Sequence, residues 1–399
     1  MSYLEKLLNG NSVEYKPLGE VIKLEKGKQL NKEMLSESGL YPAYNGGISF
    51  SGYTDVYNYD ENKTIISQGG ASAGFVNFIT TKFYANAHCY VIITDYKKVV
   101  NRFIYHLLKL NQERLMTKQH GAGIPALRTN EILDIQIPIP CPNNPKKSLE
   151  IQQKIVGILD SFTELTAELT AELTARKTQY SYYREKLYSL DKNKVQYLPM
   201  DDESIGVFQR GKRFVKTDLI SEGVPVIHYG EMYTHYGTWA DETISFVSEK
   251  LVNDKNLRLA QKGDVVIVAA GETIEDIGLG TAWLGDEGVV VHDACFSYKT
   301  TLNPKFVAYF TRTKQFHDQI KKHISSGKIS AINSRGLGKA IIPVPSKEEQ
   351  ERVVAILDKF DILTNSISEG LPKEIALRQK QYEYYRDLLL TFPQYNIKK

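Results

Sequence analysis

The sequence has few of the features that mark secreted, membrane or metal-binding proteins. Its 399 residues include three cysteines, Cys89, Cys141 and Cys295, too few and too widely spaced for a disulfide framework or a zinc cluster. The longest apolar runs, such as GDVVIVAAG, are too short to cross a bilayer. The N-terminal MSYLEKLLNG lacks the basic and apolar regions of a signal peptide. We therefore expect a protein of the reducing cytoplasm with no membrane contact.

Recognisable catalytic motifs are also missing. The glycine-rich SQGGASAGF (67–75) does not continue into a nucleotide-binding loop, and neither Gly-x-Ser-x-Gly nor an S-adenosylmethionine loop occurs. DENK (60–63) contains the Glu-x-Lys of metal-dependent nucleases but has no upstream Pro-Asp, and the histidines show no ligand spacing. The sequence therefore predicts a chain with no catalytic residues and no metal site of its own.

Composition is that of an ordinary globular protein, with 42% hydrophobic and 24% charged residues. A chain of this length exceeds the usual size of one hydrophobic core, so two or more domains are expected. The net charge of +3 permits a nucleic-acid partner without indicating one.

The most informative feature is an internal repeat. IPIPCPNNPKKSLEIQQKIVGILDSF (137–162) returns as IPVPSKEEQERVVAILDKF (342–360), and RKTQYSYYREKL (176–187) returns as RQKQYEYYRDLL (378–389). Looser matches precede them, with Gly27-Lys28 over Gly211-Lys212 and Ala126 over Ala331. Each repeat is thus a variable region of domain size followed by a well-matched helical region.

The helical regions carry a coiled-coil pattern. In the first, apolar residues from Ile151 to Leu190 are spaced by alternating steps of three and four, apart from two successive fours at Leu165–Leu169–Leu173, where Thr-Ala-Glu-Leu occurs twice. One helix over 148–190, roughly 60 Å long, is predicted. In the second, Gly370-Leu371-Pro372 should kink or interrupt the helix. The two helices are natural partners in an antiparallel coiled coil; a helical core of no special purpose is the alternative.

The variable regions read as mixed α/β heads. KTIISQ, CYVIIT, DVVIVA and EGVVVHDACFSY are typical of strands between glycine- and asparagine-rich turns, and 101–115 and 303–322 each predict one helix. The predicted fold is therefore two pseudo-twofold-related α/β heads separated by an antiparallel coiled coil. The predicted boundaries are an N-terminal helical segment (1–11), a first head (12–140), a central helical spacer (141–194), a second head (195–345) and a C-terminal helical spacer (346–399).

Two heads held at a fixed separation can read two half-sites on one DNA duplex. Polar and basic loop residues in both heads are candidates for contacts with base edges or phosphates, although each alone is more often a solvated surface residue. The candidates are Tyr44, Asn45, Gln68, Lys118, His120 and Arg128 in the first head and Arg213, His228, Tyr229, Thr273, Lys328 and Asn333 in the second.

Three blocks occur twice: Ile-Pro-x-Pro (137–140 and 342–345), a helical segment from Gln to Phe (152–162 and 350–360), and Gln-Tyr-x-Tyr-Tyr-Arg (in 179–187 and 381–389). Together with the heads, they resemble the specificity subunit of type I restriction–modification systems over essentially the whole chain. The resemblance implies that each head is a target recognition domain for half of a bipartite sequence in double-stranded DNA. It implies that the helices dock two modification (methyltransferase) subunits, with or without restriction (nuclease/translocase) subunits. Binding of S-adenosylmethionine, ATP and Mg would then belong to those partners. A coiled-coil scaffold that binds no DNA is the competing hypothesis.

The tyrosine–arginine blocks are the candidate docking surface. Tyr and Arg are favoured anchors in protein interfaces. The candidates are Tyr182, Tyr183, Arg184, Tyr384, Tyr385 and Arg386. Plain packing along the coiled coil explains Tyr183, whereas a bound partner better explains the neighbours that point away from it.

The Thr-Ala-Glu-Leu repeat predicts a ruler. Four residues add about 6 Å of helix and about 40° of rotation, whereas one DNA base pair adds about 3.4 Å and roughly 35°. We expect each tetrad to widen the gap between half-sites by one base pair. Neutral slippage in a tolerant helix is the alternative.

Overall fold

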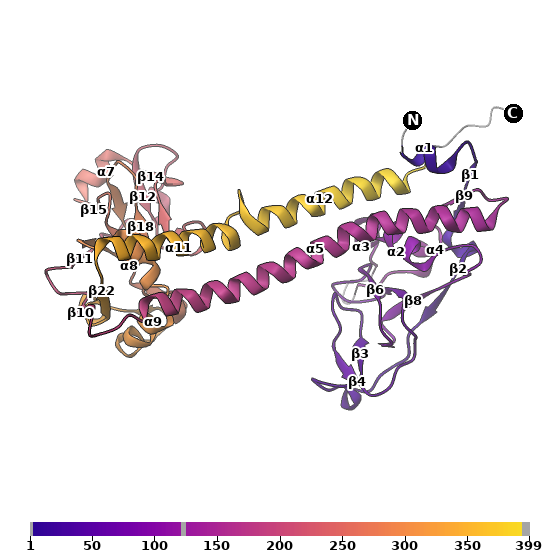
Figure 1. Ribbon diagram of the computed structural model, residues 1–399, viewed down its shortest axis with the longest axis horizontal. Coiled ribbons are helices and arrows are strands. Elements are labelled where there is room, and N and C mark those ends of the chain that lie inside the picture. The colour runs from indigo at the N-terminus through magenta and orange to yellow at the C-terminus, as the bar shows by residue number, and fades with distance from the viewer. Residues whose placement is uncertain (1–2, 121–124, 393–399) are drawn as a thin grey trace. The chain divides into compact units, whose positions relative to one another are not determined.

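The chain forms two compact units in a computed structural model that describes residues 3–120 and 125–392. Unit 1 comprises residues 1–170 and 374–399, and unit 2 comprises residues 171–373. The boundary in the first helical region falls between Thr170 and Ala171, inside the tetrad repeat. Each unit therefore contains one head together with helical segments from both repeats (Figure 1).

The head of unit 1 consists of three small sheets and short helices. A β1–β9 ribbon lies where the chain enters and leaves the head, and the other sheets have the orders β2-β8-β5-β6 and β4-β3-β7. The strands are β1 (Val13–Pro17), β2 (Ile22–Lys26), β3 (Tyr41–Tyr44), β4 (Gly52–Thr54), β5 (Lys63–Ser67), β6 (Val76–Ile79), β7 (Tyr84–Ala85), β8 (Cys89–Thr94) and β9 (Gln136–Pro140). The helices are α1 (Tyr3–Leu8), α2 (Asn101–Leu110), α3 (Gln112–Thr117) and α4 (Thr129–Leu133).

The head of unit 2 repeats this plan with a few additions. Its sheets have the orders β10-β22, β11-β20-β16-β18-β13, β14-β12-β19-β15 and β17-β21. The main strands are β10 (Gln196–Pro199), β11 (Gly206–Arg210), β12 (Val224–Ile227), β13 (Trp239–Ala240), β14 (Ser245–Val247), β15 (Leu259–Ala260), β16 (Val265–Val268), β17 (Ala270–Gly271), β18 (Gly280–Trp283), β19 (Val289–Val291), β20 (Cys295–Thr300), β21 (Ser330–Ala331) and β22 (Ile341–Val344). Its helices are α6 (Glu231–Thr234), α7 (Glu249–Asp254), α8 (Pro304–Phe310), α9 (Lys314–Ile320) and α10 (Ser334–Gly338), with a short 3-10 turn η4 (Ile274–Asp276).

The heads share one topology although their sequences diverge. The order β2-β8-β5-β6 corresponds to β11-β20-β16-β18, and β4-β3-β7 corresponds to β14-β12-β19. The mixed α/β prediction is confirmed, and the four predicted strand segments contain β5, β8, β16, and β19 with β20. Apolar runs form these central strands because most of their side chains are buried on both faces of the sheet.

The predicted helical regions are long helices, and the predicted interruption is present. Helix α5 runs without a break over Pro145–Tyr188, whereas the second region is divided into α11 (Lys347–Asn365) and α12 (Gly370–Leu390). Gly370 has a φ of +71°, and a Cβ atom there would lie 2.3 Å from the carbonyl oxygen of Ile362. The break therefore requires glycine at this position.

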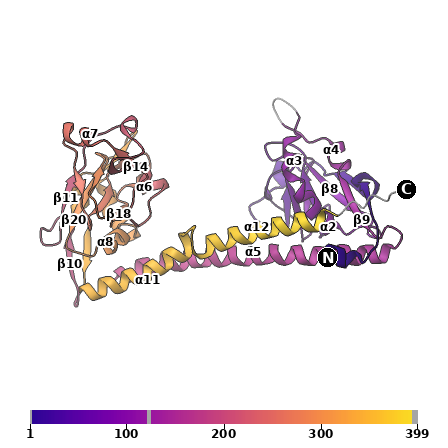
Figure 2. The ribbon, with the colours of Figure 1, turned by 90° about the horizontal axis from the view of Figure 1, so that it is seen from above.

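Within each unit the helical segments pack side by side in opposite directions (Figures 1 and 2). In unit 1 the ring of Tyr385 on α12 stacks on Phe162 of α5, with centroids 5.2 Å apart. In unit 2 the rings of Tyr180 and Tyr183 on α5 stack on Phe360 of α11 at 5.9 Å and 5.6 Å. The antiparallel pairing predicted from the apolar spacing is present in both units.

Repeated polar residues attach the helices to the heads. Gln152 Oε1 accepts a hydrogen bond from the Val100 backbone N–H at 2.9 Å, and Gln350 Oε1 accepts one from Asn303 at 2.8 Å. Because these glutamines satisfy backbone donors at the start of α2 and α8, the repeat retains them for a structural reason.

An aspartate of each repeat makes a second attachment. In unit 1, Asp160 accepts hydrogen bonds from Arg102 Nε at 2.7 Å and His106 Nε2 at 2.9 Å. In unit 2, Asp358 accepts hydrogen bonds from Lys305 Nζ at 2.5 Å and the Tyr309 hydroxyl at 2.7 Å. The same acceptor thus holds a different pair of donors in each unit.

The expectation of one helix in each of 101–115 and 303–322 is wrong. The first segment is divided into α2 and α3 at Asn111, and the second into α8 and α9 at residues 311–313. The hydroxyls of Thr311 and Thr313 donate to the carbonyls of Ala308 and Phe310, both at 2.7 Å. These local bonds stabilise a turn in place of a continued helix.

Candidate nucleic-acid interface

The parallel pairing of β12 with β19 places two histidines side by side in unit 2. The strands are in register at Ile227 and Val291, so the next residues, His228 and His292, leave the same sheet edge together. Their rings lie with centroids 4.8 Å apart. No spacing in the sequence indicates this neighbourhood, because the two residues are far apart along the chain.

The turn after β11 closes over the same edge. The Gly211 N–H donates to the carbonyl of Cys295 and the Lys212 N–H to that of Val291. A Cβ atom at Gly211 would lie 2.2 Å from the His292 carbonyl oxygen, so only glycine fits. This close approach places Arg213 and Phe214 next to the two histidines.

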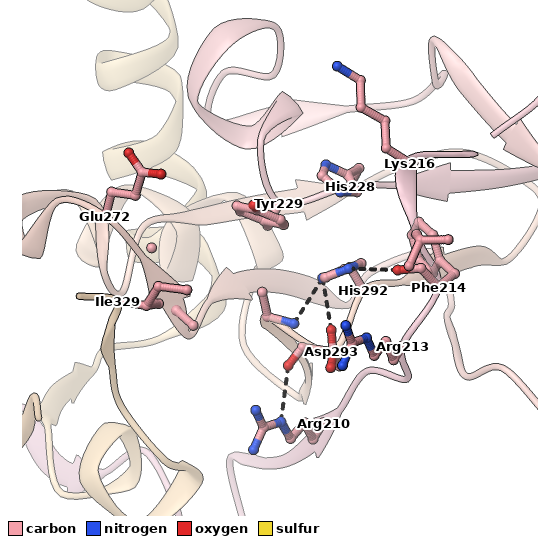
Figure 3. Close-up of a pocket in the computed structure, with 14 residues that line it drawn as sticks. Arg210, Arg213, Phe214, Lys216, His228, Tyr229, Glu272, His292, Asp293 and Ile329 are labelled. Atoms are coloured by element: carbon pink, nitrogen blue, oxygen red, sulfur yellow. Dashed lines mark hydrogen bonds and ion pairs between the residues drawn. The ribbon is translucent and has the colours of Figure 1, made fainter. Parts of the chain in front are cut away.

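These segments surround a cavity of about 500 Å³. Figure 3 shows its lining residues, with the His292 ring between Phe214 and the backbone of residues 293–294. The charged side chains in the lining are Arg210, Arg213, Lys216, Glu272 and Asp293. Three cations against two carboxylates make a mildly electropositive site, which suits a phosphodiester or the acceptor-rich edge of a base.

Four of the residues that line the cavity carry aromatic rings, including the two imidazoles. Phe214 lies edge-on to His292 at 4.8 Å, and Tyr229 lies 4.5 Å from His228 and 5.2 Å from His292. His292 is buried, whereas His228 and Tyr229 are half-buried, and all three line the cavity. Such rings offer both stacking faces and hydrogen-bonding atoms to a ligand.

Hydrogen bonds and burial define the protonation of the histidines. His292 Nε2 donates to the Phe214 carbonyl at 3.1 Å, so Nδ1 accepts from the Ala294 N–H at 3.1 Å. Burial lowers the pKa of His292, and the charges of His228 and Arg213 oppose the attraction of Asp293. Burial also lowers the pKa of His228. Both rings are therefore neutral near pH 7. His228 Nδ1 accepts from the Gly230 N–H at 3.2 Å, which leaves the Nε2–H of His228 to donate.

Unit 1 builds the corresponding turn with the same glycine–lysine pair. The Gly27 N–H donates to the Cys89 carbonyl and the Lys28 N–H to that of Ala85, and a Cβ atom at Gly27 would lie 2.2 Å from the Asn86 carbonyl oxygen. Asn86 occupies the position of His292, and its Oδ1 accepts from the Leu30 N–H at 3.3 Å. The scaffold is therefore repeated, while the side chains at its edge differ.

The structure brings three of the predicted second-head residues together. Arg213, His228 and Tyr229 line the cavity. Thr273 and Lys328 are exposed next to the lining residues Glu272 and Ile329. Asn333 lies outside the lining, and its Oδ1 accepts from the Gly336 N–H at 2.8 Å as the N-cap of α10.

The first-head residues are more dispersed. Asn45, Lys118, His120 and Arg128 are exposed, and Tyr44 and Gln68 are half-buried. The Tyr44 ring lies edge-on to Phe83 at 6.0 Å, and the Gln68 backbone bonds to both His88 and Leu127. His120 Nε2 lies 3.7 Å from Glu131 Oε1. Contacts within the head therefore hold Tyr44 and Gln68 in place. The other four candidates have exposed side chains that a ligand can reach.

Sequence reasoning did not select Arg210, Phe214, Lys216, His292 or Asp293, which also line the cavity. The signal that identifies His292 is its position directly after the apolar run VVV, at the end of a buried strand. Using that signal requires the β12–β19 register, which only the structure supplies.

Comparison with known proteins decides the family. Residues 11–176 and 203–377 each match the type I restriction modification DNA specificity domain. The chain is 34% identical to the EcoR124I/EcoR124II specificity subunit of Escherichia coli, over 98% of both chains. It is 29% identical to the EcoprrI specificity subunit of E. coli over 92% of both. The chain belongs to the type I restriction–modification specificity subunits.

The fold agrees with that assignment. The structure matches the S subunit of a type I restriction–modification system from M. genitalium with a TM-score of 0.58 at 20% identity, over 99% of this chain and all of the other. The family resemblance drawn from the repeated blocks is confirmed, and so are the DNA-specificity role and the assignment to a non-catalytic subunit. None of the helices within the described residues is both long and apolar enough to span a membrane.

The predicted docking residues of this specificity subunit fall into two groups. Tyr183 and Tyr385 stack on Phe360 and Phe162 and pack inside their units. Tyr182 and Tyr384 are 58% and 64% exposed. Exposed tyrosines at matching positions of both repeats are the part of this set that is free to contact another protein.

The two arginines of that set also differ between units. Arg184 lies over the Tyr180 ring at 5.2 Å, and Arg386 lies over Tyr382 at 5.7 Å. Arg386 additionally donates from Nε and Nη2 to Asp387 at 2.9 Å and 2.8 Å. Arg386 is thus paired inside its unit, whereas Arg184 forms no ion pair with any described residue.

Proposed function

We propose that this subunit reads a bipartite sequence in double-stranded DNA, one half with each head, and that its helices set the gap between the halves. The cavity of unit 2 carries this proposal, because it combines exposed cations with half-buried neutral rings at one sheet edge. Arg213 and Lys216 at the rim contact phosphates, and His228 and Tyr229 contact base edges. The exposed first-head residues Asn45, Lys118, His120 and Arg128 serve the other half.

The helices dock two modification subunits through surfaces that include Tyr182 and Tyr384, with or without restriction subunits. S-adenosylmethionine, ATP and Mg bind to those partners, and the assembly acts in the cytoplasm. The exposure of these two tyrosines supports docking, because large exposed aromatic side chains at equivalent positions suit a repeated protein contact.

Substitution of the cavity histidine tests the assignment of bases to heads. His228→Ala should relax base preference at one half of the target by about 1–3 kcal/mol, equivalent to roughly 5–150-fold in discrimination, while the other half is unchanged. His235→Ala is the matched control, since His235 is an exposed histidine of the same head outside the cavity. The measurement is sequencing of methylated sites in cells carrying the complete system. Equal relaxation at both halves would contradict the two-head assignment, and an assembly that binds no DNA would favour the scaffold hypothesis.

A further inference from the structure

A second cavity in unit 2 is lined by residues whose side chains include buried nitrogens without a hydrogen-bond partner. It has a volume of about 540 Å³ and lies between the end of α5, the turn joining α8 to α9, and η4. Among the described residues, five buried side-chain nitrogen or oxygen atoms lack a hydrogen-bond partner. Three of these, Arg184 Nε, Arg312 Nε and His317 Nε2, belong to residues that line this cavity. Arg184 Nε and Arg312 Nε can only donate, and buried donors without acceptors are rare in folded proteins, so these two beside one cavity indicate a missing acceptor.

Two of the three acidic residues that line the cavity, Glu185 and Asp318, are engaged elsewhere, and the third is Glu275. The Glu185 carboxylate accepts from the backbone N–H groups of Lys314 at 2.6 Å and Gln315 at 3.3 Å, at the start of α9. Asp318 accepts from Lys314 Nζ at 2.5 Å. Asp361 attracts Arg312 only from a distance, because no described acidic group lies within ion-pair range of either arginine. The two guanidinium groups therefore lack a paired carboxylate.

The fold holds these guanidinium groups in place. Arg312 Nη2 donates to the carbonyls of Gly237 at 2.8 Å and Gly280 at 3.1 Å. Arg184 lies over the Tyr180 ring. Burial lowers the pKa of Arg312, and the nearby charge of Arg184 lowers it further against the attraction of Tyr180 and Asp361. Two adjacent fixed cations make a preorganised site for one anion.

In unit 1 the arginine at the matching position has a carboxylate acceptor. Arg386 corresponds to Arg184 in the repeat, and it donates to Asp387. Glu185 occupies the position of Asp387 but is turned to the start of α9. The unpaired arrangement is thus a property of unit 2 and not of the repeat in general.

We propose that this cavity, the arginine socket, receives the carboxylate of an Asp or Glu side chain of a modification subunit. This inference rests on the proposed docking of modification subunits and specifies the chemical group that the socket binds. Tyr182, on the same helical segment as Ser181 and Arg184, is 58% exposed and provides an adjoining contact surface for a protein. Glu275 and Asp318 also line the socket. They would repel the many phosphates of a nucleic acid more than a single carboxylate.

Assembly and stability measured together test the socket. Arg184→Gln should weaken association of the full chain with its modification subunits by about tenfold or more, since it removes one partner of a desolvated charge pair. The unfolding temperature of the free chain should stay the same or rise, because an unpaired cation is removed. Lys177→Gln, an equal loss of charge at an exposed position of α5, should change assembly less than about twofold. Sedimentation velocity gives the first quantity and differential scanning fluorimetry the second.

A photo-crosslinking amino acid at Ser181 then identifies the contact. The crosslinked peptide should contain an acidic residue whose amide variant is non-additive with Arg184→Gln in a double-mutant cycle. Wild-type assembly with an unaffected Arg184→Gln variant would overturn the socket alone. A variant that assembles normally but binds DNA more weakly would assign the socket to a phosphate and also overturn it. Failure of the wild-type chain to assemble would overturn both this inference and the proposed docking.

Discussion

Unit 1 and unit 2 fasten their helices to their heads with the same aspartate and different donors. Asp160 is held by Arg102 and His106, and Asp358 by Lys305 and Tyr309. His106 Nδ1 also accepts from the Tyr382 hydroxyl at 3.0 Å. Tyr309, at the matching position of unit 2, has no ring nitrogen and cannot accept such a bond. The repeat therefore preserves the acceptor on the helix, whereas each head supplies its own donors. The attachment can therefore persist while the heads diverge.

The aspartate substitutions should have the largest effect on stability. Asp160→Ala leaves the buried His106 and the nearby Arg102 without their acceptor, and Asp358→Ala does the same to Lys305 and Tyr309. Each change should destabilise its own unit by about 2–4 kcal/mol. Hydrogen exchange should show faster opening of α2 in the first variant and of α8 in the second. Equal loss of protection in both units from either variant would contradict separate attachments.

The stacked phenylalanines of the two units should differ in stability by an intermediate amount. Phe360 stacks on both Tyr180 and Tyr183, whereas the ring that stacks on Phe162 within the described residues is Tyr385. Since an aromatic pair contributes about 0.5–1.5 kcal/mol beyond burial, Phe360→Leu should cost roughly 1 kcal/mol more than Phe162→Leu. Denaturant unfolding of the two variants, followed by hydrogen exchange of α11 and α12, measures the difference. A larger loss from Phe162→Leu would reverse the ranking.

The smallest predicted effect is a pH dependence of the helix attachment, which contains a histidine in unit 1 and none in unit 2. Burial lowers the pKa of His106 below its ordinary value of about 6.5, although Asp160 opposes the shift. His106 binds a proton less readily in the folded state than in the unfolded state. Its contribution to the free energy of unfolding is therefore complete above about pH 6.5 and is lost as the pH falls toward the folded pKa. Burial would raise the pKa of Asp160, but the hydrogen bonds from His106 and Arg102 outweigh burial and lower this pKa. Unit 1 should therefore lose further stability below about pH 4, where Asp160 becomes protonated.

Hydrogen exchange of α2 and α8 at pH 7 and pH 5.5, corrected for the intrinsic pH dependence of exchange, measures this difference. Protection of α2 should fall more than that of α8, and His106→Tyr, which introduces the residue found at the matching position of unit 2, should remove the excess. An identical pH response in both helices would rule out His106 as its cause.

Much of this architecture could be predicted from the sequence because the repeat carries it. The spacing of apolar residues predicted α5 and its partners, and Gly370 with Pro372 predicted the interruption. The division of 101–115 and 303–322 into two helices depends on side-chain bonds at Asn111 and Thr311, which periodicity does not detect. The neighbourhood of His228 and His292 arises from strand register, and residues distant in sequence become adjacent only through it.

The tetrad repeat has the structural properties that a ruler needs. Helix α5 passes through both copies without a break, and no residue from Thr163 to Gln179 is fully buried. Leu165, Leu169 and Leu173 are half-buried, and the Ala and Glu positions between them are exposed. A further tetrad would therefore repeat the same face of the helix and would disturb no buried core residue.

Sequencing of methylated sites in cells that carry one additional Thr-Ala-Glu-Leu after Leu173 tests whether α5 sets the gap between the half-sites. We propose that two heads read two half-sites and that α5 sets the gap between them. The insertion adds about 6 Å and about 40° of helix, and the rotation is close to the roughly 35° of one base pair. The predicted result is a target with both half-sites unchanged and a gap wider by one base pair, and removal of one tetrad should narrow the gap equally. An unchanged gap with full methylation would contradict the account.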